Sequence, residues 1–159
     1  MTVKKNIVIT GGGTGGHIYP GLAIAQEIRK THPHIEVHFV GARGGLEENI
    51  LPKTEYTYHL IKMDRLHSSV GRLRQLKTLC LLPFSFLHAL YIFNKIKPVA
   101  VLGVGGFASG PFLFVAWLMK AKTALWEANA YPGLANRWLS RVVGKCYLVF
   151  GEAGRHLKP

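Results

Sequence analysis

Acidic residues are scarce in this sequence. Its 159 residues include only 8 Asp and Glu against 20 Lys and Arg, which gives a formal net charge of +12 at pH 7. Such an excess of positive charge favours an anionic partner. Three candidates are nucleic acid, an acidic membrane surface and a phosphorylated ligand. The alternative is a basic protein without a special partner, because net charge alone selects no ligand.

Cysteine is nearly absent as well. Cys80 and Cys146 lie in apolar stretches, form no CxxC motif and have no histidine at a metal-ligand spacing, which excludes a disulfide framework and a cysteine-based metal site. We interpret them as buried thiols of a reducing compartment. The sequence shows no acidic pair at a metal-ligand spacing, so we expect neither a metal ion nor a cofactor. Lys4 and Lys5 lead directly into an apolar strand, so we expect no signal peptide.

Long uninterrupted hydrophobic runs are missing too. Residues 99–119 carry no charge and are long enough to cross a bilayer, but four glycines and Pro111 interrupt them. Residues 79–93 are apolar but shorter than the roughly 20 residues that a span requires, and they contain Pro83 and His88. We therefore expect no transmembrane helix.

Short apolar strands alternate with helical patterns along the whole chain. The expected strands are residues 6–10, 35–40, 56–61, 99–102, 123–126 and 145–149, and the expected helices are residues 20–30, 45–51, 72–96, 111–119 and 132–142. This alternation predicts an α/β fold with a doubly wound, mostly parallel sheet, similar to the Rossmann fold. We expect residues 1–159 to form one domain.

The first expected strand ends in a glycine-rich loop. Gly11, Gly13 and Gly16 match the pattern GxGxxG, which lets backbone N–H groups approach an anion at a helix start. A dinucleotide site would also require an acid at the end of the second strand, where the sequence reads FVGAR instead. Arg43 keeps an NADP-dependent oxidoreductase open as an alternative. His17 follows the loop at the start of the helix. Its imidazole either exchanges protons near neutral pH or only caps the helix and packs against its neighbours.

Two further loops follow expected strands. Residues 103–111 read GVGGFASGP, so they either contact a sugar or diphosphate or form a turn that needs glycine. Residues 126–133 place Glu127 beside Asn129, which either binds sugar hydroxyls or caps the next helix. All three loops stand at carboxyl ends of strands, where open α/β sheets bind ligands.

Together these motifs resemble the N-terminal domain of the bacterial MurG family. The resemblance runs over residues 6–151 and rests on GGTGGH at 12–17, PGLA at 20–23, GVGGFASGP at 103–111, EAN at 127–129 and PGLAN at 132–136. It implies one half of a GT-B glycosyltransferase, with inverting, metal-independent transfer from UDP-N-acetylglucosamine. The acceptor is the MurNAc C4 hydroxyl of undecaprenyl-pyrophosphoryl-MurNAc-pentapeptide, so lipid I becomes lipid II in peptidoglycan synthesis.

The sequence departs from this family in three ways. Trp126 and Ala128 replace the family's common His and Gln, and Phe107 stands where Tyr is frequent. The family's second α/β domain, which holds most of the UDP, is missing from this sequence. We therefore expect the acceptor side to be present and transfer to be absent or reduced without that domain. A stand-alone module that binds lipid-linked diphosphate, or half of another GT-B glycolipid transferase, stays open.

Candidate roles follow from the chemistry and the resemblance. In an inverting transfer a base takes the proton of the attacking hydroxyl, and His17 and Glu127 are the candidates. Glu127 alternatively orients the acceptor or a histidine. We expect the first loop to bind phosphate and the other two loops to contact a sugar or diphosphate. The expected substrate contacts are Thr14, Gly15, Gly16, Gly105, Gly106, Phe107, Ser109 and Asn129.

An apolar segment flanked by cations predicts membrane contact. Its expected contact residues are Arg72, Leu73, Leu76, Lys77, Phe84 and Phe86. Such a surface suits an interfacial helix on anionic lipid, although burial against the sheet would give the same pattern. The resemblance implies a peripheral place on the cytoplasmic face of the bacterial plasma membrane. Nucleic acid explains the charge less well, because the basic residues form no recognisable binding module.

Overall fold

A single parallel sheet forms the centre of the molecule. The computed structural model describes residues 5–62 and 72–158, and of residues 72–81 it describes the backbone only. The six strands are β1 (Lys5–Thr10), β2 (Ile35–Ala42), β3 (Thr57–Ile61), β4 (Ala100–Gly103), β5 (Lys122–Glu127) and β6 (Lys145–Leu148). Their order is β3-β2-β1-β4-β5-β6, and every neighbouring pair is parallel. This confirms the predicted doubly wound α/β fold.

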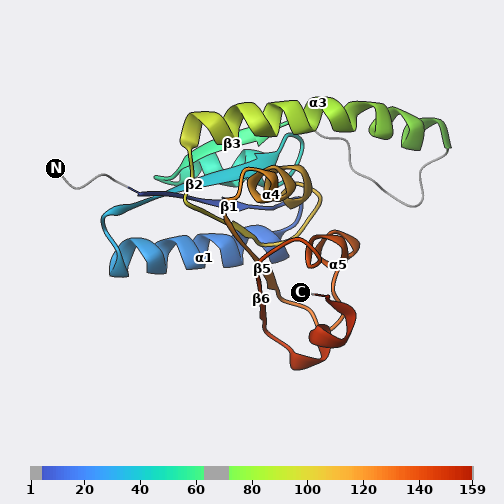
Figure 1. Ribbon diagram of the computed structural model, residues 1–159. Helices are drawn as coiled ribbons and strands as arrows, with labels where there is room; N and C mark the ends of the chain where they lie inside the picture. Colours follow the sequence, from blue (N-terminus) through green and yellow to red (C-terminus); the bar gives the residue numbers. More distant parts are fainter. Residues whose placement is uncertain (1–4, 63–71, 159) are drawn as a thin grey trace.

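Helices cover both faces of the sheet (Figure 1). They are α1 (Gly15–Thr31), α2 (Glu47–Ile50), α3 (Arg72–Ile96), α4 (Ser109–Leu118) and α5 (Leu134–Leu139), with the short 3-10 helices η1 (Leu51–Lys53) and η2 (Gly151–His156). The helices α3 and α4 lie on one face and α1 lies on the other, while α5 stands beside α4 toward the C-terminal end of the chain (Figure 1). Among the described residues, no helix is long and apolar enough to cross a membrane.

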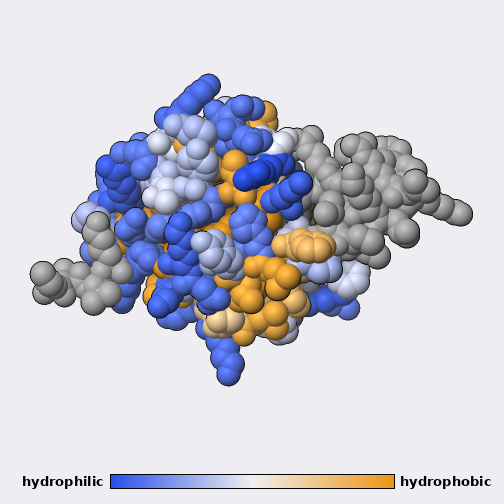
Figure 2. Space-filling model, turned by 90° about the horizontal axis from the view of Figure 1, so that it is seen from above, coloured by the Kyte–Doolittle hydropathy of each residue, from blue (hydrophilic) through white to orange (hydrophobic). Residues whose placement is uncertain are grey.

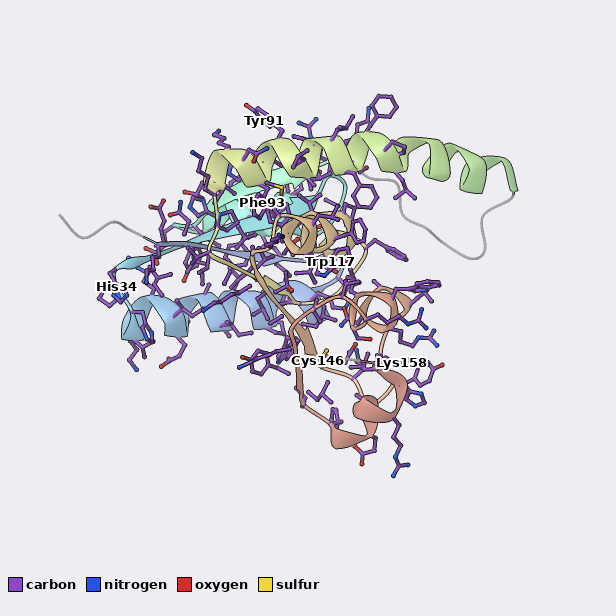
Figure 3. All side chains as sticks on the ribbon, in the orientation of Figure 1. His34, Tyr91, Phe93, Trp117, Cys146 and Lys158 are labelled. Carbon is purple, nitrogen blue, oxygen red and sulfur yellow. The ribbon has the colours of Figure 1, made fainter. Side chains whose placement is uncertain are left out.

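The alternation of side chains along the strands divides the core into two layers. Val8 belongs to the layer under α3 and α4, and its neighbour Ile9 belongs to the layer under α1. Phe112 of α4 is fully buried in the first layer. On α3, Phe93 points toward the sheet while Tyr91 points outward (Figure 3). Both faces of the sheet are therefore apolar, as a parallel sheet requires.

Two helices differ most from the predicted boundaries. The first begins at Gly15 instead of near Pro20, so Pro20 lies in the second turn of α1. Helix formation that far upstream is tolerated because the missing N–H of Pro20 affects only the carbonyl of Gly16, in the first turn. Conversely, α5 covers only Leu134–Leu139, and it begins later than predicted because its N-cap Gly133 has an extended backbone.

The strand order places the ends of β1 and β4 side by side. From β1 the chain continues to β2 on one side, and from β4 it continues to β5 on the other. The loops after β1 and β4 therefore leave in opposite directions and open a crevice at the carboxyl edge of the sheet. The next loop, after β5, lies beside it.

Replacing Phe112 tests this packing. We expect Phe112→Ala to lower the free energy of unfolding by about 3–5 kcal/mol, because it leaves a cavity in the layer under α3 and α4. Phe84→Ala is the matched control, since Phe84 is 69% exposed on α3, and it should change the value by at most about 0.5 kcal/mol. Urea unfolding followed by circular dichroism measures both. Equal effects of the two replacements would contradict the described packing.

Candidate functional site

The first three glycines of the loop after β1 use their N–H groups inside the protein. Gly11 donates to the Val40 carbonyl at 3.1 Å, and Gly12 donates to the Gly105 carbonyl at 3.2 Å. Gly13 donates to Oε2 of Glu47 at 2.7 Å. The N–H groups of Thr14, Gly15 and Gly16 have no acceptor among the described residues. Only these last three N–H groups are free for a ligand.

The loop after β4 lies directly against the glycine loop. Gly105 and Gly106 have φ angles of +99° and +79°, which favour glycine. A Cβ at Gly106 would collide with the Gly12 carbonyl, so the two loops meet backbone to backbone. The turn interpretation of this loop therefore holds, because its backbone has positive φ at both glycines and its contact with Gly12 leaves no room for a side chain. Contact of this loop with a sugar or diphosphate stays a prediction.

His17 lies in the first turn of α1, above the junction of these two loops. Its Nδ1 is 2.8 Å from Oγ1 of Thr14, the N-cap residue, whose hydroxyl makes no capping bond to the backbone. The imidazole packs against Gly105, where a Cβ would displace it. Burial lowers the pKa of His17 below 6.5, while the charge of Glu127, the Gly12 backbone and the charge of Glu47 act in the opposite direction. The ring is therefore mainly neutral at pH 7.

Glu127 ends β5 with its side chain 3% exposed. Its Oε1 accepts hydrogen bonds from the backbone N–H and from Nδ2 of Asn129, at 2.9 and 2.8 Å. Its Oε2 accepts a bond of 2.9 Å from Nδ2 of Asn136, which is buried in α5. The carboxylate thus holds the loop after β5 against α5. Asn129 does not cap α5, because the N-cap is Gly133.

One pocket of about 280 Å³ joins most of the predicted residues. Its lining includes the predicted His17, Gly105, Gly106, Phe107, Glu127 and Asn129, together with Tyr131, Leu134, Ala135 and Asn136. Thr14, Gly15 and Gly16 lie just before His17 and outside this lining. Ser109 is fully buried and donates its hydroxyl to the Gly106 carbonyl at 2.7 Å, so it supports the loop from behind.

The predicted membrane residues fall into three groups. Phe84 is exposed on α3, whereas Phe86 is half-buried and packs against Phe114 of α4, with ring centroids 5.5 Å apart. Phe86 therefore belongs to the core side of α3. The other four predicted residues, Arg72, Leu73, Leu76 and Lys77, lie outside the described side chains.

Two polar side chains that shape the site were not among the residues predicted from the sequence. Glu47 is fully buried in α2 and accepts N–H bonds from Gly13 and Ala42, the latter at 2.8 Å. No local motif marks it, although Gly41, Gly44 and Gly45 crowd the segment before it. Asn136 belongs to a motif quoted for the family resemblance, but its role as a partner of Glu127 depends on the tertiary fold.

Comparison with known proteins agrees with this geometry. The model of the glycosyltransferase family 28 N-terminal domain matches residues 7–148. A relative from Bdellovibrio bacteriovorus, a UDP-N-acetylglucosamine–N-acetylmuramyl-(pentapeptide) pyrophosphoryl-undecaprenol N-acetylglucosamine transferase, is 52% identical over 99% of this chain and 44% of its own. A relative of the same name from Myxococcus xanthus is 44% identical over 92% of this chain and 38% of its own. The chain thus spans less than half the length of these relatives.

A solved structure supports the same assignment. The crystal structure of MurG from Acinetobacter baumannii is similar with a TM-score of 0.81 and 25% identity, over 93% of this chain and 42% of that chain. A putative UDP-N-acetylglucosamine 2-epimerase from Listeria monocytogenes shares the fold at a TM-score of 0.61 and 12% identity, over 98% of this chain and 42% of its own. Because the family model matches from β1 to β6, the chain belongs to glycosyltransferase family 28, as its N-terminal domain.

Proposed function

We propose that this chain is the acceptor side of an inverting N-acetylglucosaminyltransferase. The reaction moves N-acetylglucosamine from UDP-N-acetylglucosamine to the MurNAc C4 hydroxyl of undecaprenyl-pyrophosphoryl-MurNAc-pentapeptide, which converts lipid I to lipid II. The observation that carries the proposal is the meeting of His17, Glu127 and Asn129 in one pocket at the crevice between β1 and β4. The names of the two bacterial relatives support the choice of substrates.

His17 is the better candidate for the base. In the tautomer that donates from Nδ1 to the Thr14 hydroxyl, Nε2 carries the lone pair that accepts the proton of the attacking hydroxyl. Burial keeps the pKa of His17 below 6.5, so the ring is ready to accept a proton at neutral pH. Attack on the anomeric carbon then proceeds as the diphosphate of the donor leaves from the opposite side.

Glu127 acts as the electrostatic partner of His17 in this proposal. Its two oxygens already accept three N–H bonds, so proton transfer to it would disrupt the loop that it holds. Its charge raises the pKa of His17 against the effect of burial, and it therefore stabilises the imidazolium that forms during attack. Asn129 keeps its side-chain carbonyl for a sugar hydroxyl, because only its Nδ2 is bonded to Glu127.

A diphosphate fits the free start of α1. The unpartnered N–H groups of Thr14, Gly15 and Gly16 stand at the positive end of a 17-residue helix. They lie within three residues of His17, so a substrate held there brings its sugar to the pocket. Phe107, which is exposed at the rim, offers a flat apolar surface to that sugar.

Contact with the cytoplasmic face of the plasma membrane rests on the outer surface of α3. Phe84, Leu87 and Tyr91 follow one another at helical spacing and are 69%, 64% and 65% exposed. Figure 2, which views the molecule from above, shows that apolar surface gathers on part of a mainly hydrophilic face. Lys95 and Lys97 are exposed at the end of this helix. Apolar side chains beside cations suit an anionic lipid surface.

A hybrid enzyme tests the proposed reaction. In it this chain replaces the matching 158 residues of the Bdellovibrio bacteriovorus relative, and transfer of labelled sugar from UDP-N-acetylglucosamine to lipid I is measured. We expect the hybrid to be active and this chain alone to be inactive. A folded hybrid that binds lipid I without transferring sugar would instead favour a diphosphate-binding module.

Removing the proposed base should reduce turnover strongly. In the hybrid, we expect His17→Ala to lower kcat by about 100- to 10,000-fold, as loss of a general base does. Tyr19→Ala is the control, since Tyr19 is 60% exposed on the same helix. Near-normal turnover of His17→Ala would exclude His17 as the base.

The pH profile reports the same group. Acid protonates the base, so kcat/KM of the hybrid should fall as the pH drops through the pKa of His17, which burial places below 6.5. Most of the activity should therefore be present at pH 7, where the imidazole is mainly neutral. The residual activity of His17→Ala should not show this acid limb. An acid limb centred above pH 6.5 would contradict the assignment.

Vesicle binding tests the surface of α3. We expect sedimentation with vesicles that contain anionic phosphatidylglycerol and little binding to phosphatidylcholine vesicles. Because each buried apolar side chain contributes about 1.5–3 kcal/mol, Phe84→Ser with Leu87→Ser should weaken partitioning at least about tenfold. Tyr19→Ser on the opposite face of the sheet is the control. Equal binding by both variants would rule out this surface.

A further inference from the structure

Glu47 is a buried acid at the site that the proposed reaction does not use. It lies at the start of α2, next to the end of β2, and its side chain is fully buried. Among the described residues it has no cationic partner within 4 Å, since the ion pairs found there are Arg29–Glu55 and His38–Glu36. Its partners are two backbone N–H groups, those of Gly13 and Ala42.

The surrounding backbone is shaped around this carboxylate. A Cβ at Gly12, Gly41 or Gly45 would collide with the side chain of Glu47. These three glycines come from the loop after β1, the end of β2 and the segment before α2. The carboxylate therefore ties the glycine loop to β2, in a socket that leaves no room for another group.

This arrangement decides where an anion can bind. Two N–H groups of the glycine loop are used by carbonyls, and the third is used by Glu47 itself. A phosphate at Gly12 or Gly13 would meet a full negative charge at short range without a cation between them, and like charges repel strongly in a buried site. The N–H groups of Thr14, Gly15 and Gly16 lie beyond this socket.

We propose that Glu47 is a positioning and specificity residue, which holds the glycine loop closed and confines a substrate diphosphate to Thr14, Gly15 and Gly16. The proposal rests on the proposed function, because it assigns that diphosphate its place beside His17. It also predicts that this GxGxxG loop does not bind a dinucleotide. The pyrophosphate of such a cofactor would need the N–H groups that Glu47 and the neighbouring carbonyls already occupy.

Inorganic pyrophosphate and the 159-residue chain itself provide the test. Amide shifts followed by NMR should place pyrophosphate at Thr14, Gly15 and Gly16 in the unaltered chain, while the Gly12 and Gly13 amides keep their protection from hydrogen exchange. In Glu47→Gln we expect pyrophosphate affinity to rise at least about tenfold and contacts to extend to Gly13, whose N–H Glu47 holds in the unaltered chain, because the repelling charge is gone. A purely structural role predicts weaker or unchanged binding.

Two further variants and one titration complete the test. Glu48→Gln is the matched control, since the Glu48 side chain is exposed and accepts a hydrogen bond from the Gly44 N–H, outside the glycine loop, and it should leave the contacts unchanged. Glu47→Asp keeps the charge and should retain the restriction, which covers the case in which Glu47→Gln fails to fold. The NMR pKa of His17 should fall in Glu47→Gln and stay unchanged in Glu48→Gln, because the charge of Glu47 raises it.

Specific outcomes would overturn the proposal. Contacts of pyrophosphate with Gly12 and Gly13 in the unaltered chain would do so, as would a folded Glu47→Gln with unchanged affinity and contacts. Failure of both the unaltered chain and Glu47→Gln to bind pyrophosphate would remove the specificity claim. These outcomes are separate from failure of the proposed function, which the transfer of sugar by the hybrid enzyme tests.

Discussion

The backbone contact between Gly12 and Gly106 fixes the geometry of the site. The parallel order puts β1 beside β4, and their loops meet without side chains between them. The Gly12 N–H bonds the Gly105 carbonyl across this contact, and His17 then rests on Gly105. Any side chain at the contact would push the two loops apart. The pocket therefore depends on glycine as a spacer of minimal size more than on the flexibility that glycine gives.

Two of the eight acids of this basic chain are buried at the site. The carboxylates of Glu47 and Glu127 accept hydrogen bonds from N–H groups of the backbone and of Asn side chains instead of pairing with cations, at distances of 2.7 to 2.9 Å. Each therefore organises one loop, and together they raise the pKa of His17 against the opposing effect of burial. The pKa of His17 thus reflects desolvation on one side and two fixed charges on the other, and this balance depends on the loops staying in place.

The sequence predicts the parts of this structure that local patterns determine. The strands and the three glycine- or Asn-containing loops follow from apolar runs and turn residues, and so does the meeting of His17 with Glu127 at one edge. The role of Glu47 does not follow, because its partners are backbone groups 5 and 34 residues away. Ser109 and Phe86 have the residue types expected of a substrate contact and a membrane contact. Packing nevertheless directs both side chains into the protein.

The positive charge of the chain lies away from the pocket, so the two have different roles. No Lys or Arg lines the described pocket, although the chain carries a net charge of +12. In the proposed function, a phosphate near the pocket would therefore be held by N–H groups of a helix start and not by cations, while two buried carboxylates stand close by. Every Lys and Arg side chain that the structure describes is at least partly exposed, and its attraction for an anionic surface acts over roughly one Debye length, about 8 Å in physiological salt. In the proposed function, charge of this kind would draw the molecule to a membrane, and the N–H groups and shape of the pocket would select what it binds there.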